Sequence, residues 1–221
     1  LKVNKFPIVN LIIRHYVKFN IKKFILLVGY KNSKFLEELS KNALKKKIIN
    51  KSLTELTIKV NKKVISVKIL NTGAKSQKKK RLLLARKYIL ENEFFLTYGD
   101  GLSNVNIKKQ YIFFKKSKKI GLITTVNPPS RFGEVKLKGD LITNFSEKPN
   151  MSSGYINGGF MILSSKIFNL INIKKKGDFE ETVLSNLSRK KQILSFKHLK
   201  FWQCIDNERE LTYMNSYVKK T

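Results

Sequence analysis

The sequence has little cysteine and no long apolar run, and each shortage excludes a class of protein. Its one cysteine, Cys204, cannot form an internal disulfide, so the chain is not a disulfide-stapled scaffold and suits a reducing compartment. No apolar stretch reaches the ~18 residues that a membrane span needs. Nor does a charged segment lead into an apolar run and a cleavage site, as in a secretory signal. We therefore expect a cytoplasmic protein with no membrane partner.

Acidic residues are also scarce: 15 Asp and Glu stand against 46 Lys and Arg, which gives a formal net charge of +31. Such an excess suggests a polyanionic partner, for example nucleic acid. The lysines, however, lie in short runs along the whole chain (45–47, 78–80 and 174–176) among many Asn and Ile, as an A- and T-rich genome would encode. We expect the charge to attract nucleotide and sugar phosphates, and rank a nucleic-acid binder last of three functions.

Apolar residues, in contrast, are sufficient for a core, since 42% of the chain is hydrophobic. Apolar periodicity predicts helices at 7–16, 33–44, 81–90, 107–116, 166–171, 179–188 and 208–218. Strands are expected at 23–30, 53–58, 62–70, 121–126, 133–137, 141–147, 155–163 and 193–197, and in the run that leads to Asp100. Alternating strands and helices predict an α/β fold with a doubly wound sheet, and the short strands after Pro129 predict a small antiparallel annex.

One strand ends in an unusual way, as Phe94-Phe95-Leu96-Thr97-Tyr98-Gly99-Asp100-Gly101. It delivers the Asp100 carboxylate, between two glycines, to the carboxyl edge of the sheet, where little side-chain bulk keeps phosphates or a metal away. Taken alone, Gly-Asp-Gly is also ordinary turn chemistry. The choice between these two interpretations depends on the other segments expected at the same edge.

Several further segments are expected there, in the order Arg131-Phe132-Gly133, Glu147-Lys148-Pro149, Asn157-Gly158-Gly159-Phe160 and Trp202-Gln203-Cys204-Ile205-Asp206. Together with the Pro7 helix, Val28-Gly29-Tyr30-Lys31 and Asn71-Thr72-Gly73, this ordered set resembles the sugar-phosphate nucleotidyltransferase family, most closely its glucose-1-phosphate cytidylyltransferase branch. The resemblance implies a Rossmann-like, doubly wound mixed sheet of the nucleotide-diphospho-sugar transferase type, in a homo-oligomer. It also implies that CTP and glucose 1-phosphate react to give CDP-glucose and pyrophosphate.

The resemblance further implies a role for each matching residue. Asp100 and Asp206 would be catalytic carboxylates that hold Mg²⁺, which prefers hard oxygen ligands, and Lys148 would face the sugar phosphate. The substrate-binding residues would be Thr72, Gly73, Arg81, Tyr98, Gly99, Arg131, Gly133, Glu147, Asn157 and Gly158.

Simpler structural interpretations stand beside these roles. Asp206 alone would be a cap for the last helix, and Asn157-Gly158 would be a glycine bulge. The adjacent charges of Glu147 and Lys148 would be a solvated strand end. The two histidines match no motif, so we expect no catalytic role for them.

One element of the family has no counterpart in the sequence. The relatives carry a Gly-Gly-x-Gly-Thr-Arg loop after their first strand, whose backbone N–H groups cradle the triphosphate. Here the only Gly-Gly pair is Gly158-Gly159, and Lys79 and Lys80 stand where relatives have two glycines before Arg81. We therefore expect residues 1–221 to be a single, N-terminally truncated domain whose sheet lacks its first strand. A second hypothesis follows: a non-catalytic nucleotide-sugar binding module, or a decayed homologue.

Overall fold

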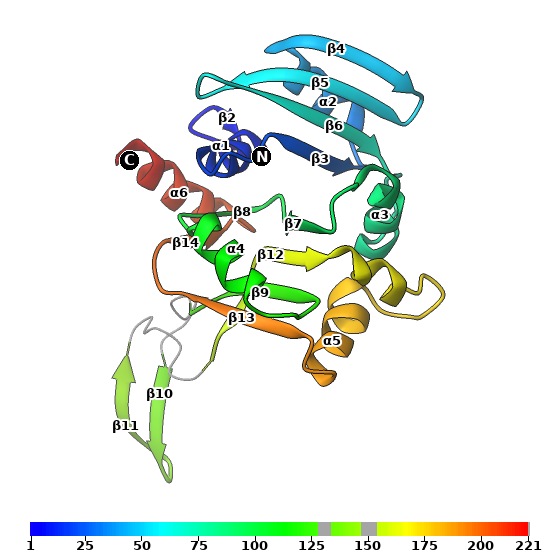
Figure 1. Ribbon diagram of the computed structural model, residues 1–221. Coiled ribbons are helices and arrows are strands. Elements are labelled where there is room, and N and C mark those ends of the chain that lie inside the picture. Colours follow the sequence, from blue (N-terminus) through cyan, green and yellow to red (C-terminus); the bar gives the residue numbers. More distant parts are fainter. Residues whose placement is uncertain (128–133, 147–153, 221) are drawn as a thin grey trace.

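The computed structural model describes residues 1–127, 134–146 and 154–220 (Figure 1). Its strands are β1 (Lys2–Val3), β2 (Phe6–Pro7), β3 (Lys23–Val28), β4 (Ala43–Asn50), β5 (Leu53–Val60), β6 (Lys63–Asn71), β7 (Glu93–Thr97), β8 (Gly101–Ser103), β9 (Gly121–Val126), β10 (Glu134–Lys138), β11 (Leu141–Ser146), β12 (Ile156–Ser164), β13 (Ile193–His198) and β14 (Trp202–Cys204). The α-helices are α1 (Ile8–Lys18), α2 (Asn32–Ser40), α3 (Lys78–Ala85), α4 (Ile107–Lys115), α5 (Ser185–Arg189) and α6 (Glu208–Lys220). Two 3₁₀ helices, η1 (Arg86–Tyr88) and η2 (Ser165–Leu170), and a π-helix, η3 (Glu180–Leu184), complete the elements.

Two mixed sheets of four strands form the body of the fold, in the orders β3-β6-β5-β4 and β13-β9-β12-β7. Within them, β3 pairs with β6 and β13 with β9 in parallel, whereas the other neighbours are antiparallel. The expected α/β class with a mixed sheet is therefore confirmed. The antiparallel annex is the β10-β11 hairpin, which projects away from the body (Figure 1).

Helix α1 packs on both sheets and so holds them together. Its Ile13 and Val17 belong to a core cluster with residues of β5 and β6. Its Ile12 and Tyr16 belong to another cluster, with Phe160 of β12. The helix thus fixes how the carboxyl ends of β3 and β7 face each other.

The helix predicted over 33–44 ends earlier than expected, and the lysine run at 45–47 that follows it lies in a strand. Helix α2 ends at Ser40, and the run lies in strand β4, which forms the outer edge of its sheet beside β5. Most of β4 is exposed, so its side chains show no apolar alternation that would reveal a strand. Lysines on an exposed edge strand discourage pairing with other chains.

Strands β3 and β7 are less buried than their continuous apolar runs predict. Every residue from Phe24 to Val28 and from Phe94 to Thr97 is only half-buried. Each strand has a paired neighbour on one side, β6 for β3 and β12 for β7. Within the part of the chain that the structure describes, the other edge of each strand faces the space between the two sheets. Separately, none of the helices within the described ranges is both long and apolar enough to cross a bilayer.

His15 lies in an aromatic setting rather than in a catalytic one. Its ring contacts Tyr16 and Phe19 edge-on, with centroids 5.8 and 5.4 Å apart, and burial lowers the pKa of His15 to about 4. Between pH 6.5, the ordinary pKa of histidine, and about pH 4, the unfolded chain binds a proton at His15 that the folded chain does not. The free energy of unfolding therefore falls as the pH falls through this range. We expect the unfolding free energy of the wild type to fall by about 2 kcal/mol between about pH 7.5 and pH 5 through this effect. His15→Phe should not show this loss, and urea titrations at the two pH values measure it.

His198→Gln is the matched control for this prediction, because it removes the other histidine, whose Nε2 lies 3.0 Å from the carbonyl oxygen of Phe201. Equal losses of stability in the wild type and in His15→Phe would contradict the assignment to His15.

Candidate functional site

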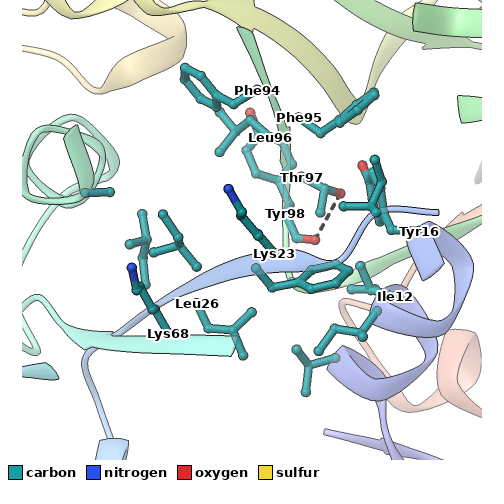
Figure 2. Close-up of a pocket in the computed structure, with 18 of the residues that line it drawn as sticks. Ile12, Tyr16, Lys23, Leu26, Lys68, Phe94, Phe95, Leu96, Thr97 and Tyr98 are labelled. Carbon is teal, nitrogen blue, oxygen red and sulfur yellow. Dashed lines mark hydrogen bonds between the residues drawn. The ribbon is translucent and has the colours of Figure 1, made fainter. Parts of the chain in front are cut away.

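The carboxyl ends of β3 and β7 border a cleft of about 1640 Å³. Val28, Arg81, Tyr98 and Asp100 line its carboxyl end, and helices α1 and α3 contribute to its walls. Figure 2 shows Ile12 and Tyr16 of α1 beside the cleft. In open α/β sheets, ligands bind outside the carboxyl ends of the strands. The predicted site residues are therefore expected at this edge.

Thr72, Gly73 and Arg81 meet where β3 and β6 end. The Thr72 hydroxyl donates to the Val28 carbonyl oxygen at 2.8 Å, and Arg81 Nη1 lies 2.7 Å from that hydroxyl oxygen. Arg81 Nε also donates to the Ser76 carbonyl oxygen at 2.8 Å. The guanidinium is thus held in a fixed orientation at the cleft, which favours binding of an anion over a freely moving side chain.

The two lysines before Arg81 have different environments. Lys79 is 2% exposed, and its Nζ donates to the carbonyl oxygens of Lys175 at 2.6 Å and Asn172 at 3.3 Å. Lys79 is therefore buried and bound to the backbone, and it stabilises the fold. Lys80 is exposed.

Asp100 and Asp206 are brought close in the fold by the pairing of two short strands. Gly101 of β8 lies opposite Cys204 of β14, and the Ile205 N–H donates to the Asp100 carbonyl oxygen at 2.9 Å. Both aspartates are exposed at this junction. Two carboxylates that are 106 positions apart in the sequence thus lie on adjoining backbone segments.

Asn207, and not Asp206, caps the last helix. The Asn207 side-chain oxygen accepts from the Glu210 N–H at 3.0 Å, and the Asp206 N–H donates to Glu210 Oε2 at 2.7 Å. The capping interpretation of Asp206 is therefore wrong. Cys204, Asp206 and Glu210 also place one potential ligand atom each within 4.8 Å of one another. Within this group, the two carboxylates supply the hard oxygen atoms.

Tyr98 and Asn157 belong to one polar network at the carboxyl end of β7. The Tyr98 hydroxyl donates to Glu180 Oε1 and accepts from Asn157 Nδ2 at 3.3 Å, while Lys78 Nζ lies 2.6 Å from the same Glu180 oxygen. Burial and the Glu180 carboxylate raise the pKa of Tyr98, so its hydroxyl keeps its proton. Burial opposes ionisation of Glu180, but the hydrogen bonds from Lys78, Tyr98 and the Glu180 backbone, together with the Lys78 charge, outweigh it and lower the pKa of that carboxyl.

Sequence reasoning missed Lys78 and Glu180. The network joins residues 102 positions apart, and no sequence pattern links them. Glu180 stands with Glu181 in the first turn of a predicted helix, where acids are ordinary because of the helix dipole. An acidic residue at this position therefore gave no indication of the contact with Tyr98.

The predicted glycine bulge at 157–158 is confirmed, and it lies in the site. The register between β12 and β9 shifts between Asn157 and Met161, and Trp202 Nε1 donates to the Gly158 carbonyl oxygen at 2.7 Å. A Cβ at Gly158 would lie 3.0 Å from the Thr124 carbonyl oxygen. Glycine at this position therefore permits close packing of β12 against β9 and β14. Gly99, by contrast, has open space around it.

Four predicted residues, Arg131, Gly133, Glu147 and Lys148, lie outside the described residues. For the others, the structure forms two groups at the same edge. Thr72, Gly73 and Arg81 make the first, and Tyr98, Gly99, Asp100, Asn157, Gly158 and Asp206 make the second.

Comparisons with known proteins agree with this geometry. The family model described as nucleotidyl transferase matches residues 1–219. The "Probable glucose-1-phosphate cytidylyltransferase" of Bacillus subtilis (strain 168) is 31% identical over 214 residues, which cover 95% of this chain and 83% of that protein. The glucose-1-phosphate cytidylyltransferase of Salmonella typhimurium (strain LT2) is 30% identical over 218 residues, which cover 97% and 84%.

Solved structures give the same fold. The crystal structure of an apo UDP-glucose pyrophosphorylase superposes with a TM-score of 0.65 at 14% sequence identity, over 100% of this chain and 89% of that one. At this identity, the match supports the architecture. It confirms the expected nucleotide-diphospho-sugar transferase type of fold.

Proposed function

Because the chain belongs to the nucleotidyl transferase family, we propose that it joins CTP and glucose 1-phosphate to give CDP-glucose and pyrophosphate. In this reaction, a phosphate oxygen of glucose 1-phosphate attacks the α-phosphorus of CTP. A new P–O bond forms, and the bond between the α-phosphorus and the oxygen that bridges to the β-phosphate breaks. The names of the two cytidylyltransferase relatives support this choice of nucleotide and sugar.

The observation that carries the proposal is the junction of β8 and β14, which places Asp100 beside Ile205 and Asp206. Two exposed carboxylates on adjoining segments fit the oxygen donors that Mg²⁺ prefers. We assign Asp100 and Asp206 as the residues that would hold the ion. When bound, Mg²⁺ supplies positive charge that offsets the repulsion between the two phosphate-bearing substrates.

The chain's own groups supply the rest of the electrostatics. Arg81 is fixed at the cleft and would bind phosphate oxygens of the nucleotide, together with Thr72 and Gly73. Asn157, held by Tyr98, would face the sugar hydroxyls with the Gly158 backbone beside it. Catalysis then rests on positioning and charge, as in other phosphoryl-type transfers. We keep Lys148 as a proposed contact to the sugar phosphate and Arg131 as a proposed contact to the sugar.

A substrate panel tests this function. The full chain is incubated with Mg²⁺ and either glucose 1-phosphate or mannose 1-phosphate, paired with CTP, UTP, dTTP or GTP. Pyrophosphate and nucleotide sugar are measured together by enzyme-coupled assay and mass spectrometry. We expect CTP with glucose 1-phosphate to exceed every other pair by about tenfold or more in kcat/KM.

Two outcomes would contradict it. Faster product formation with another pair would replace the proposed substrates. Saturable binding of CDP-glucose with no pyrophosphate from any pair would favour the non-catalytic binding module.

A further inference from the structure

We propose that Glu180 is a positioning residue, which acts through the Tyr98 hydroxyl to fix the side-chain amide of Asn157 at the candidate site. The inference rests on the proposed function, because that function assigns Asn157 to the sugar hydroxyls. It adds a residue that no local motif marks, together with the hydrogen bonds through which this residue acts. Glu180 itself would contact neither substrate.

The hydrogen bonds between these three side chains run in one direction. A carboxylate can only accept, so the single proton of the Tyr98 hydroxyl goes to Glu180 Oε1. The hydroxyl oxygen is then an acceptor, and Asn157 Nδ2 donates to it at 3.3 Å. The Asn157 amide must therefore turn its NH₂ group, and not its carbonyl oxygen, toward Tyr98.

The other end of the Asn157 amide is held by the backbone. Its Oδ1 accepts from the Gly159 N–H at 2.9 Å, within the bulge where β12 shifts its register against β9. Bonds at both ends of a planar amide fix its plane and the places of its oxygen and nitrogen. An amide has a second N–H proton and a second oxygen lone pair beyond these two bonds. This donor and this acceptor lie side by side, as binding of neighbouring sugar hydroxyls requires.

Lys78 keeps Glu180 in the ionised form that can only accept. Its Nζ lies 2.6 Å from Glu180 Oε1 and 3.7 Å from Asp178 Oδ2. Burial opposes the charge on Glu180, but the hydrogen bonds from Lys78 and Tyr98 help to lower the pKa of its carboxyl. At neutral pH, the direction of the hydrogen bonds is therefore set from the Glu180 end.

An unusual turn of the backbone places Glu180. It is the first residue of the π-helix η3, and π-turns are rare and occur frequently at functional sites. Just before it, Phe179 is buried in the core. The Asp178 carbonyl oxygen accepts from the Thr182 N–H at 3.1 Å and from the Thr182 hydroxyl at 2.6 Å. The turn that carries the Glu180 carboxylate is thus anchored on both sides.

Gly159 lets the Tyr98 ring pack directly against β12. Its φ is +77°, and a Cβ there would lie 2.8 Å from Tyr98 Cδ2. Stability alone does not account for this arrangement, because the side chains of Lys78 and Glu180 are 51% and 31% exposed. Ion pairs with such exposure contribute little to stability. Orientation of Asn157 is the consequence that the geometry does supply.

Glu180→Gln tests this role, because a glutamine amide keeps the shape but can donate as well as accept, so it no longer sets the direction. In the chain without substrate, we expect the nuclear Overhauser contact between the Asn157 Nδ2 protons and the Tyr98 ring to weaken by about threefold or more. With CTP, Mg²⁺ and glucose 1-phosphate, the KM for glucose 1-phosphate should rise about tenfold. The KM for CTP should change less than about twofold.

Glu181→Gln is the matched control, since it removes the same charge one residue away. Glu181 Oε2 accepts from the Asp178 N–H at 2.9 Å, and a glutamine oxygen can still accept there. We expect this control to keep both the Overhauser contact and the KM for glucose 1-phosphate. Tyr98→Phe removes the hydroxyl between the two ends and should raise that KM as Glu180→Gln does. Circular dichroism and urea unfolding check the fold of each variant.

A double variant separates positioning from a general structural effect. If Glu180 acts through Asn157, Glu180→Gln should change kcat/KM less than about twofold in a chain that already carries Asn157→Ala. Equal effects with and without Asn157, an unchanged Overhauser contact in Glu180→Gln, or the same losses in Glu181→Gln would overturn the proposal. If no substrate pair reacts, the proposed function fails instead. The Overhauser comparison then decides by itself whether Glu180 positions Asn157.

Discussion

Asp100→Asn is expected to lower nucleotide-sugar formation by on the order of 10³-fold while the fold stays intact. The side chain is exposed, and the contact to Ile205 that holds the β8-β14 junction comes from the Asp100 backbone carbonyl. Asparagine keeps that contact and the side-chain shape but removes the negative charge that a divalent cation requires. Initial rates with CTP, glucose 1-phosphate and Mg²⁺ measure the loss, and circular dichroism with urea unfolding checks the fold.

Asp140→Asn is the matched control for this variant, because Asp140 lies in the turn between β10 and β11, is exposed and loses the same charge. We expect this control to retain activity and Asp206→Asn to lose it as Asp100→Asn does. Activity of Asp100→Asn within about threefold of the wild type would remove Asp100 from the reaction.

Gly29→Ala is expected to destabilise the fold by about 2–4 kcal/mol and to displace Arg81. A Cβ at this position would lie 2.6 Å from the Gly73 carbonyl oxygen and 2.7 Å from Arg81 Nη2. The first neighbour is backbone, and the second is a guanidinium held by Thr72 and Ser76, so neither can move without breaking hydrogen bonds. Urea unfolding measures the loss, and CTP binding by calorimetry measures the effect on the nucleotide pocket.

Gly99→Ala provides the comparison for stability, since a Cβ there meets nothing within 4 Å. Its unfolding free energy should stay within about 0.5 kcal/mol of the wild type. Equal destabilisation by both substitutions would show that close packing at the end of β3 is not what requires Gly29.

Elements with a strong apolar period were predictable from the sequence. The strand expected at 121–126 is β9 with the same bounds, and the helix expected at 107–116 is α4 to within one residue. Strand β4 was not predicted, because an edge strand that is exposed on both faces has no alternation of apolar and polar residues. Its lysines also resembled the basic residues that are common at the end of a helix. Burial gives a sequence its pattern, so elements with little burial are the ones that sequence reasoning misses.

The candidate site was predictable only in part, for a related reason. Tyr98 and Asn157 matched motifs that stand out locally, and the structure joins them by a hydrogen bond at one edge of the sheet. Glu180 did not, because its contact with Tyr98 depends on packing between segments 82 positions apart. The same holds for the half-buried state of β3, which depends on its having β6 as its one paired neighbour within the described residues rather than on its own sequence.

Manganese relaxation measurements test most directly whether Asp100 and Asp206 act together. Mn²⁺ replaces Mg²⁺ at oxygen-rich sites and broadens the NMR signals of nearby nuclei, so it locates the ion without requiring turnover. With CTP present, we predict selective broadening of the Gly101 and Ile205 amide signals, lost in both Asp100→Asn and Asp206→Asn but kept in Asp140→Asn. Broadening centred elsewhere, for example around Glu180, or unchanged in both variants, would contradict a shared metal site at the β8-β14 junction.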